Sequence, residues 1–422
     1  MYLKTVGCAL FKLSDKQQEA ATEIRKWYLG SKQTFYLAGY AGTGKTTIVN
    51  HVVDGLGEKI KPVYCAFTGK AASVLEAKGN TPACTVHSLI YRLEETQVPD
   101  PKDPTKRILT MKFTLRDLAP ESFDCADNEY SNSDNENSLI DWCNLIVLDE
   151  CSMISKSLYE DLLSFGKKIL ILGDPGQLPP IDGRSPFSAP ELLLTEVHRQ
   201  ASDSNILTLA TKARRNIQIG FCNFDDAVCA KKNQFENFYK PGYQVLCGTN
   251  NSRFKYNNLI RRELWYKTEN LFPLAGEPIT CLKNDRDLGL FNGQELICLE
   301  HDLMDKTPKE QAGYPYSALM KIKMVVSING KKLNVNADFR WFKACAESDS
   351  KKLTELRKEK SEFKNSNLVG FDYAHCITCH KSQGSQWDNV IIIDESYCFR
   401  DMKAKWLYTA LTRAAKKVWL LK

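Results

Sequence analysis

The stretch at residues 34–46, TFYLAGYAGTGKT, decides the fold of this chain. Its segment 39–46 matches the pattern G-x-x-x-x-G-K-[ST] and lies between a short apolar run at 34–38 and a helical pattern at about 45–53. In this context, glycines let backbone N–H groups converge on phosphate oxygens, and the helix N-terminus adds a partial positive charge. The pattern therefore predicts a phosphate-binding loop of an α/β domain rather than a plain Gly-rich turn.

The residues that would complete a nucleotide site follow from the same chemistry. Lys45 is expected to reach the β- and γ-phosphates, and the Thr46 hydroxyl is expected to ligate Mg²⁺. Asp149 and Glu150 end the apolar run 143–148, where an acidic pair can hold Mg²⁺ through Asp149 and polarise the attacking water through Glu150. The sequence thus predicts hydrolysis of a nucleoside triphosphate with Mg²⁺ as a cofactor.

Further apolar runs extend the α/β pattern along the chain. The runs at 62–67, 143–148 and 168–172 alternate with helical patterns, which is typical of a parallel sheet covered on both faces. The same alternation returns after Arg199, with a helical stretch at 205–215 and apolar runs at 243–247, 371–378, 390–394 and 418–421. We therefore expect two α/β domains, at residues 1–200 and 201–422.

Each domain carries an insertion. The first, at about 90–141, is polar, and its part 121–141 has seven acidic residues and no Lys or Arg, which predicts an exposed acidic loop. In the second domain, short alternating runs between about 277 and 338 predict a small antiparallel β unit, within an insertion at about 285–368.

Composition limits the class of protein. The 422 residues are 43% hydrophobic and carry a formal net charge of +6, which excludes a collagen, a coiled coil or a wholly disordered chain and suits a polyanionic partner without requiring one. No apolar window reaches the roughly 18 residues of a membrane span, and the first residues do not form a secretory leader. The 15 cysteines are scattered through apolar segments, so we expect most to be buried thiols in a reducing, cytoplasmic compartment.

Three further motifs indicate a motor rather than a kinase or a GTPase. GDPGQLPP at 173–180 places the Gln177 amide near a γ-phosphate, while TCHKSQGS at 378–385 and YTALTRA at 408–414 lie in the second α/β domain. Together with the phosphate loop, this set resembles the superfamily 1 helicases, and within them the RecD-like and Dda-like group of subclass B. The resemblance implies two RecA-like motor domains, an SH3-like insertion opening at FNGQ (291–294), and a monomeric ATP-dependent DNA helicase that moves 5′ to 3′.

The resemblance also implies roles for single residues. LSDKQ at 13–17 resembles the family's adenine-reading motif, and Arg199 and Arg413 match its two γ-phosphate arginines, which can contribute roughly a thousandfold in rate. The expected catalytic residues are Lys45, Glu150, Gln177, Arg199 and Arg413, and the expected metal ligands are Thr46 and Asp149. The expected nucleotide contacts are Gln17, Gly39, Tyr40, Ala41, Gly42, Thr43, Gly44, Lys45, Thr46, Thr47, Gln177, Arg199, Gly384 and Arg413.

Contacts to the nucleic acid strand follow from the same family motifs. Short polar groups suit phosphate contacts without base specificity, although each could instead be a helix cap or a satisfied core residue. The candidates are Thr68, Thr85, His87, Asn250, Thr378 and His380. The acidic stretch occupies the place where related enzymes carry a duplex-splitting pin, so we expect the pin to be a hairpin at 109–118, with Phe113 as the wedge.

Alternative interpretations remain at this point. CITCH at 376–380 matches the c-type haem pattern C-x-x-C-H, but without an export signal we expect a structural or ligandless pair of cysteines. A translocase that strips proteins from a strand without unwinding duplex would carry the same motor motifs. A binding module with a decayed ATP site would not retain Lys45, Asp149, Glu150 and both arginines. The expected partners are single-stranded DNA and forked duplex DNA, with single-strand-binding or replication proteins as candidates and no membrane.

Overall fold

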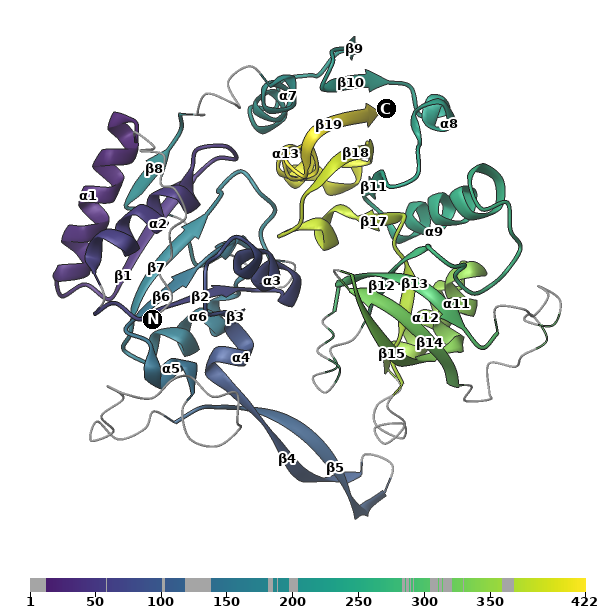
Figure 1. Cartoon of the computed structure of the whole chain (residues 1–422), viewed down its shortest axis with the longest axis horizontal. Helices are drawn as coiled ribbons and strands as arrows, with labels where there is room; N and C mark the ends of the chain where they lie inside the picture. Colours follow the sequence, from purple (N-terminus) through teal and green to yellow (C-terminus); the bar gives the residue numbers. More distant parts are fainter. Residues whose placement is uncertain are drawn as a thin grey trace.

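The computed structural model describes most of the chain (Figure 1). The described residues are 13–57, 59–100, 103–117, 138–180, 185–187, 189–196, 204–282, 285, 288, 290, 292–303, 310, 313, 321–328, 330–358 and 368–422, with the backbone alone for those between 93 and 113 and for 357–358. Two parallel sheets with their helices, a long hairpin and an antiparallel sheet make up this part of the molecule. None of its helices is long and apolar enough to cross a membrane.

The first sheet has six parallel strands in the order β3-β2-β6-β7-β1-β8. The strands are β1 (Thr34–Gly39), β2 (Pro62–Ala66), β3 (Ala83–Thr85), β6 (Leu145–Leu148), β7 (Lys168–Gly173) and β8 (Leu192–Leu194). The helices are α1 (Asp15–Leu29), α2 (Lys45–Leu56), α3 (Gly69–Ala77), α4 (Val86–Ile90), α5 (Leu139–Trp142) and α6 (Lys156–Leu163), with a 3₁₀ turn η1 (Cys151–Met153).

Both faces of this sheet are buried, as the continuous apolar runs predict. Phe35 and Leu37 of β1 pack in one cluster with α1, α2 and α3, whereas Tyr36 and Ala38 pack in the opposite cluster with α4 and α6. The alternation follows from the two-residue period of a strand. The arrangement is that of a RecA-like P-loop domain, with the phosphate loop at the carboxyl end of β1.

A second six-stranded sheet has the order β17-β11-β18-β19-β10-β9 and is parallel except for the edge pair β10–β9. Its strands are β9 (Cys222–Asn223), β10 (Ala227–Ala230), β11 (Gln244–Cys247), β17 (Cys376–Thr378), β18 (Trp387–Ile393) and β19 (Ala414–Leu421). Its helices are α7 (Asn205–Arg214), α8 (Phe235–Phe238), α9 (Asn250–Leu259) and α13 (Lys403–Leu411), with the short turns η2 (Lys232–Gln234), η3 (Ile260–Leu264), η5 (Cys379–Ser382) and η6 (Ser396–Met402).

The hairpin inserted between β3 and β6 of the first sheet is longer than predicted. Strand β4 (Tyr91–Asp100) pairs with β5 (Asp103–Leu115), and the ribbon projects away from the first sheet (Figure 1). The predicted hairpin at 109–118 is therefore wrong in extent, because the polar run 91–100 supplies its first strand through backbone pairing and not through an apolar face. Residues 118–137 of the acidic stretch lie outside the described residues, and its last residues form α5, whose Ile140 is buried, instead of an exposed loop.

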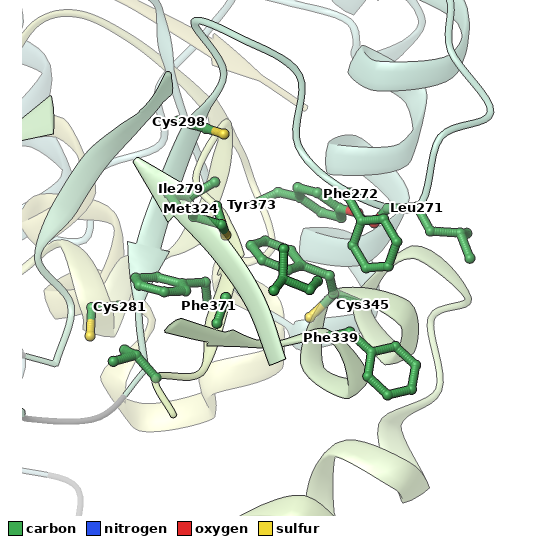
Figure 2. Packing of buried hydrophobic residues seen from close by; sticks show 14 of the residues in the cluster. Leu271, Phe272, Ile279, Cys281, Cys298, Met324, Phe339, Cys345, Phe371 and Tyr373 are labelled. Carbon is green, nitrogen blue, oxygen red and sulfur yellow. The ribbon is translucent and has the colours of Figure 1, made fainter. Parts of the chain in front are cut away.

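The antiparallel β unit predicted from short alternating runs is present. Its five strands have the order β15-β14-β13-β12-β16, and two helices cover it. Buried aromatic rings, among them Phe272, Phe371 and Tyr373, fill its core (Figure 2). The elements are β12 (Pro278–Cys281), β13 (Glu295–His301), β14 (Lys321–Ile328), β15 (Lys331–Asp338), β16 (Phe371–Tyr373), α11 (Phe339–Ala346) and α12 (Ser350–Lys358), so β12 and β16 lie just outside the range 285–368.

The apolar run 371–378 was expected to be one strand of the second parallel sheet. It forms two strands that belong to different sheets. β16 pairs with β12 in the antiparallel unit, and β17 pairs with β11 in the second parallel sheet. The Gln244 side chain donates to the carbonyls of Ala374 and His375, at 3.1 and 3.2 Å, where the chain passes from one sheet to the other. Apolar composition alone could not reveal this break because the side chains on both sides of it, those of β16 and of Cys376 and Ile377 in β17, are all buried.

A buried charged network joins the antiparallel unit to the second parallel sheet. Arg261 Nε lies 2.5 Å from Glu277 Oε1, and His375 Nε2 lies 3.0 Å from the same oxygen. Glu277 is 0% exposed and also accepts from the Leu274 amide at 2.8 Å. Burial by itself raises the pKa of Glu277, but the Arg261 charge and the bond from His375 outweigh it and hold the pKa below its ordinary value.

Glu277→Gln should therefore destabilise the protein by about 3 kcal/mol at neutral pH, because it leaves the buried Arg261 without its counter-charge. The pKa of Glu277 is lower in the folded state than in the unfolded chain. The stabilisation by the charged Glu277 is therefore complete above the ordinary pKa of a glutamate and is lost as the pH falls through the lower pKa of the folded state. Urea unfolding at a series of pH values should show the difference between wild type and variant shrinking below about pH 4.5.

Glu160→Gln, in the exposed pair with Lys156, is the matched control and should leave the unfolding midpoint unchanged. A difference between wild type and Glu277→Gln that stays constant down to acid pH would contradict this account.

Candidate functional site

The phosphate loop joins β1 to α2 and is braced by its own polar groups. Gly42 and Gly44 have φ of 81° and 78°, a left-handed backbone that favours glycine. Lys45 Nζ donates to the Gly39 carbonyl at 2.6 Å and to the Tyr40 carbonyl at 3.3 Å, and the Thr43 hydroxyl donates to the Tyr40 carbonyl at 2.8 Å. The ammonium thus lies over the mouth of the loop, where phosphate oxygens can replace carbonyl oxygens as its partners. The nucleotide candidates Thr46 and Thr47 occupy the first turn of α2.

Gln17, on α1, holds the phosphate loop through a hydrogen bond to its backbone. The Gln17 side chain is 3% exposed, and its Nε2 donates to the Thr43 carbonyl at 3.2 Å. Its Oε1 accepts from the Ser14 amide at 3.1 Å as part of the capping box that starts α1. Both ends of the amide are therefore bound within the protein, which makes Gln17 a support of the phosphate loop, while its adenine-reading role stays a prediction.

The acidic pair lies at the carboxyl end of β6, a strand next to β7 in the sheet. The Glu150 amide donates to Asp149 Oδ1 at 2.8 Å, and Glu150 has a left-handed backbone with φ of 50°, which is strained for a residue other than glycine. Burial and the neighbouring Glu150 carboxylate raise the pKa of Asp149 to about 6, and the charge of Lys45 opposes this shift. Because β6, β7 and β1 are adjacent parallel strands, the acidic pair and the phosphate loop lie at the same edge of the sheet.

Gln177, after β7, connects this acidic pair to the other sheet. With its amide oriented to satisfy both neighbours, Nε2 donates to Glu150 Oε2 at 3.2 Å and Oε1 accepts from Arg413 Nη2 at 3.3 Å. Arg413 is 5% exposed, and it also donates to the carbonyls of Thr409 and Ser385 at 3.1 and 3.2 Å. One amide thus bridges a carboxylate of the first sheet's domain and a guanidinium carried by the second.

The loop between β17 and β18 packs directly on the first domain. Gly384 has φ of 73°, and a Cβ at this position would lie 2.9 Å from the Ala71 Cβ on α3. Gln383 Nε2 donates to the Leu178 carbonyl at 3.0 Å. The predicted nucleotide-site residues Lys45, Glu150, Gln177 and Arg413 are therefore brought together in one interface, with Gly384 in the same interface against α3, whereas Arg199 lies outside the described residues.

Two of the predicted strand-contact threonines are helix caps. Thr68 Oγ1 accepts from the Ala71 amide at 3.2 Å at the start of α3, and Thr85 Oγ1 accepts from the Ser88 amide at 3.1 Å at the start of α4. Each residue is half-buried, so capping leaves part of its surface accessible. A role in strand binding stays a prediction for both.

The two candidate histidines are held by aromatic neighbours. The His87 ring lies 5.7 Å from the Phe67 ring and 5.8 Å from the Tyr91 ring, and the His380 ring lies 5.4 Å from the Phe399 ring. Burial lowers the pKa of both histidines, which favours neutral rings at neutral pH. They can therefore offer hydrogen bonds to a strand rather than a positive charge.

The remaining candidates are dispersed. Asn250 is exposed at the start of α9, and Thr378 is half-buried at the end of β17. Phe113 pairs through its backbone with Leu93. This residue pair is close to the base of the ribbon, where Tyr91 faces Leu115, and far from its tip, where Asp100 faces Asp103. Cys376 and Cys379 are buried in different hydrophobic clusters, so their side chains do not face a common ligand as the C-x-x-C-H pattern would require.

Sequence reasoning missed two residues of the interface, Tyr408 and Arg214. The Tyr408 hydroxyl contacts the phosphate loop at Ala41, and the Arg214 guanidinium lies 3.5 Å from the centre of the Tyr40 ring. A signal for Tyr408 exists, since it opens the segment 408–414 that ends next to Arg413. Arg214 has no comparable local signal.

Several known proteins are similar to this chain in sequence. A family model described as an AAA domain matches residues 12–224, and one described as a UvrD-like helicase C-terminal domain matches residues 373–421. The ATP-dependent RecD2 DNA helicase of Deinococcus radiodurans is 24% identical over 421 residues, covering 92% of this chain and 46% of that protein. The ATP-dependent DNA helicase dda of Enterobacteria phage T4 is 25% identical over 303 residues, covering 63% and 60%. The chain spans less than half the length of the first curated relatives it matches.

Solved structures of Pif1 helicases are similar in fold. A structure concerned with unwinding at forked duplex DNA by two coordinating Pif1 helicases has a TM-score of 0.53 at 16% identity, covering 97% of this chain and 92% of that chain. Bacteroides Pif1 in complex with ADP-AlF3 and single-stranded DNA has a TM-score of 0.51 with the same identity and coverage. At this identity the likeness concerns the arrangement of the sheets and not the roles of single residues.

Gln17→Ala should weaken binding of Mg-ATP by about five- to thirtyfold, because it removes one buried hydrogen bond and leaves the Thr43 carbonyl unpaired. Titration with a fluorescent ATP analogue measures the change. Gln18→Ala, at the next and exposed position of α1, is the control and should bind as wild type does. Equal affinities of the two variants would show that Gln17 does not support the loop.

Proposed function

The chain belongs to the RecD- and Dda-like branch of the superfamily 1B helicases, and on this premise we propose that it is an ATP-dependent DNA helicase. In this proposal it translocates 5′ to 3′ on single-stranded DNA and unwinds duplex DNA. The observation that carries the proposal is the Gln177 amide between Glu150 and Arg413, since it makes the hydrolytic site depend on both sheets. A simple NTPase does not need a second domain in its site, whereas a motor does.

Hydrolysis would use groups that the structure places around the phosphate loop. Lys45 binds phosphate oxygens, Glu150 orients and polarises the attacking water, and Arg413 stabilises the charge that develops on the transferred phosphoryl group. The Thr46 hydroxyl and the Asp149 carboxylate are hard oxygen donors that fit Mg²⁺. When bound, Mg²⁺ would neutralise charge on the β- and γ-phosphates.

Movement would follow from the position of Arg413 on the second domain. Arg413 would act only when the cleft between the two domains is closed. Hydrolysis would therefore require the closed state, and phosphate release would let the cleft reopen. Gln177 contacts groups on both sides, so it can respond to the presence of the γ-phosphate. Cycles of closure would then advance the enzyme along a strand bound across both domains.

The parts of the chain take roles within this proposal. Residues 1–200 and 201–422 would be two RecA-like motor domains, and the antiparallel unit would be the SH3-like insertion of the second. The β4–β5 ribbon would act as the pin that separates a duplex. Solved Pif1 structures contain single-stranded DNA, and we extend that ligand, together with forked duplex DNA, to this chain as a proposal.

Strand separation on two tailed duplexes tests the function and the polarity together. We expect ATP-dependent opening of a duplex with a 5′ single-stranded tail and no opening of one with a 3′ tail. Lys45→Ala, which removes the phosphate-binding ammonium, should abolish opening and hydrolysis. Opening of the 3′-tailed duplex alone would overturn the polarity, and the absence of strand-stimulated ATPase activity would overturn the motor itself.

The alternative function, a translocase that strips proteins from a strand, predicts a different result. It would displace streptavidin from a biotinylated single strand while leaving both tailed duplexes closed. The projecting β4–β5 ribbon favours the helicase because a translocase that only strips proteins has no use for a pin.

Phe113→Ala tests the wedge. If Phe113 separates base pairs, the variant should unwind less duplex per ATP while its strand-stimulated ATPase activity stays at the wild-type rate. Thr114→Ala, at the next position and on the opposite face of β5, is the control. Unchanged unwinding per ATP in Phe113→Ala would move the wedge to the tip of the ribbon, since Phe113 lies near its base.

A further inference from the structure

The Tyr408 hydroxyl makes two hydrogen bonds that join three separate parts of the nucleotide interface. It accepts from the Ala41 amide of the phosphate loop at 2.9 Å and donates to Asp174 Oδ2 at 2.6 Å. Ala41 follows β1 and Asp174 follows β7 in the first domain, while Tyr408 lies on α13 of the second. A single hydroxyl thus ties the phosphate loop and the loop of Gln177 to one helix of the other domain.

Packing leaves the Tyr408 ring no alternative position. The residue is 2% exposed, and its ring lies edge-on to the Tyr40 ring with the centroids 6.5 Å apart. A Cβ at Gly176 would lie 2.8 Å from Tyr408 Cε1, so the chain requires glycine there for the ring to fit. The Arg214 guanidinium also packs over the Tyr40 ring. The hydroxyl is therefore delivered to its two partners with little freedom.

The protonation of the hydroxyl suits this bonding pattern. Burial, with a contribution from the Asp174 charge, raises the pKa of Tyr408 well above its ordinary value, so the phenol keeps its proton and donates a hydrogen bond to the carboxylate. Asp174 also accepts from the Gly176 amide at 2.9 Å, which fixes the turn that leads to Gln177. The hydroxyl, the carboxylate and the turn form one chain of hydrogen bonds.

The same helix positions the arginine of the site. Arg413 Nε donates to the carbonyl of Thr409, the residue after Tyr408, and the Thr409 hydroxyl accepts from the Leu178 amide at 3.0 Å. Any shift of α13 relative to the first domain must therefore move Tyr408 and Arg413 together. The phosphate loop, the Gln177 turn and the arginine cannot take up the reacting geometry independently.

We propose that Tyr408 is a positioning residue of the ATPase site, which couples the phosphate loop and the Gln177 turn to the docking of Arg413. The inference rests on the motor function proposed above and deepens it. Tyr408 touches neither the reacting phosphate nor the attacking water. Its hydroxyl sets where the groups that do touch them lie when the cleft is closed.

Tyr408→Phe removes the hydroxyl and keeps the ring, so it tests the coupling with little change in packing. We expect the strand-stimulated kcat for ATP to fall about tenfold, while KM for ATP and the affinity for single-stranded DNA stay within about twofold. The ratio of ATPase rates with and without the strand should fall by a similar factor. A merely structural role would lower the unfolding temperature without this separation of kcat from KM.

Tyr373→Phe is the matched control, because it removes the hydroxyl of a different buried tyrosine far from the interface. The Tyr373 hydroxyl donates to the Leu271 carbonyl. Its kcat and KM should equal those of wild type. If the control loses as much kcat as Tyr408→Phe at the same loss of thermal stability, the effect comes from destabilisation and the inference fails.

A double-mutant cycle with Asp174→Asn adds a test that does not depend on the size of either single effect. If Tyr408 acts through Asp174, the double variant should be about as slow as the slower single variant, since both changes break one chain of hydrogen bonds. Additive losses in the logarithm of kcat would overturn the coupling. If the wild-type enzyme shows no strand-stimulated ATPase activity, the proposed function is refuted. If the wild type is stimulated by the strand and Tyr408→Phe has the same activity as the wild type, only this inference is refuted.

Discussion

The Gln177 amide lies between the Glu150 carboxylate and the Arg413 guanidinium, and the rest of the architecture serves to bring these two charges to it. Each charge needs a polar partner because both are largely withdrawn from water. Glu150 reaches the amide from the carboxyl end of β6, and Arg413 reaches it from the loop between α13 and β19. A site divided in this way is complete in neither domain alone, which is the physical condition under which the proposed hydrolysis could be coupled to domain movement.

The parallel sheets supply the precision that this contact needs. Because β1, β6 and β7 are adjacent and parallel, the phosphate loop, the acidic pair and the Gln177 turn all emerge at one edge of the first sheet. In the second sheet, β17 and β18 lie on the two sides of β11, and the loop between them carries Gln383 and Gly384 to the same interface. Tyr408 packs against Gly176, and Gly384 packs against Ala71, at distances that leave no room for a side chain on either glycine.

The antiparallel unit depends on the second sheet through the Arg261, Glu277 and His375 network. It also meets the first domain, since Lys70 of α3 pairs with Glu295 of β13 at 2.7 Å and lies over the Trp387 ring of β18. This one cluster therefore joins three parts of the molecule through a half-buried ion pair. The Gln177 contact and the insertion thus lie on the same boundary between the two domains.

The sequence by itself determined the elements whose signal is local. The phosphate loop, the buried parallel strands and the acidic pair were predictable from residue type and spacing, because a short segment carries both the geometry and the chemistry, whereas Arg413 followed from the resemblance of segment 408–414 to a family motif. Only the tertiary structure decided the contact of Tyr408 with Ala41, the division of 371–378 between two sheets, the polar strand β4 and the engagement of Gln17 beneath the loop. These features join residues far apart in the chain, and a hydrogen bond that spans 367 positions leaves no period or motif in either segment.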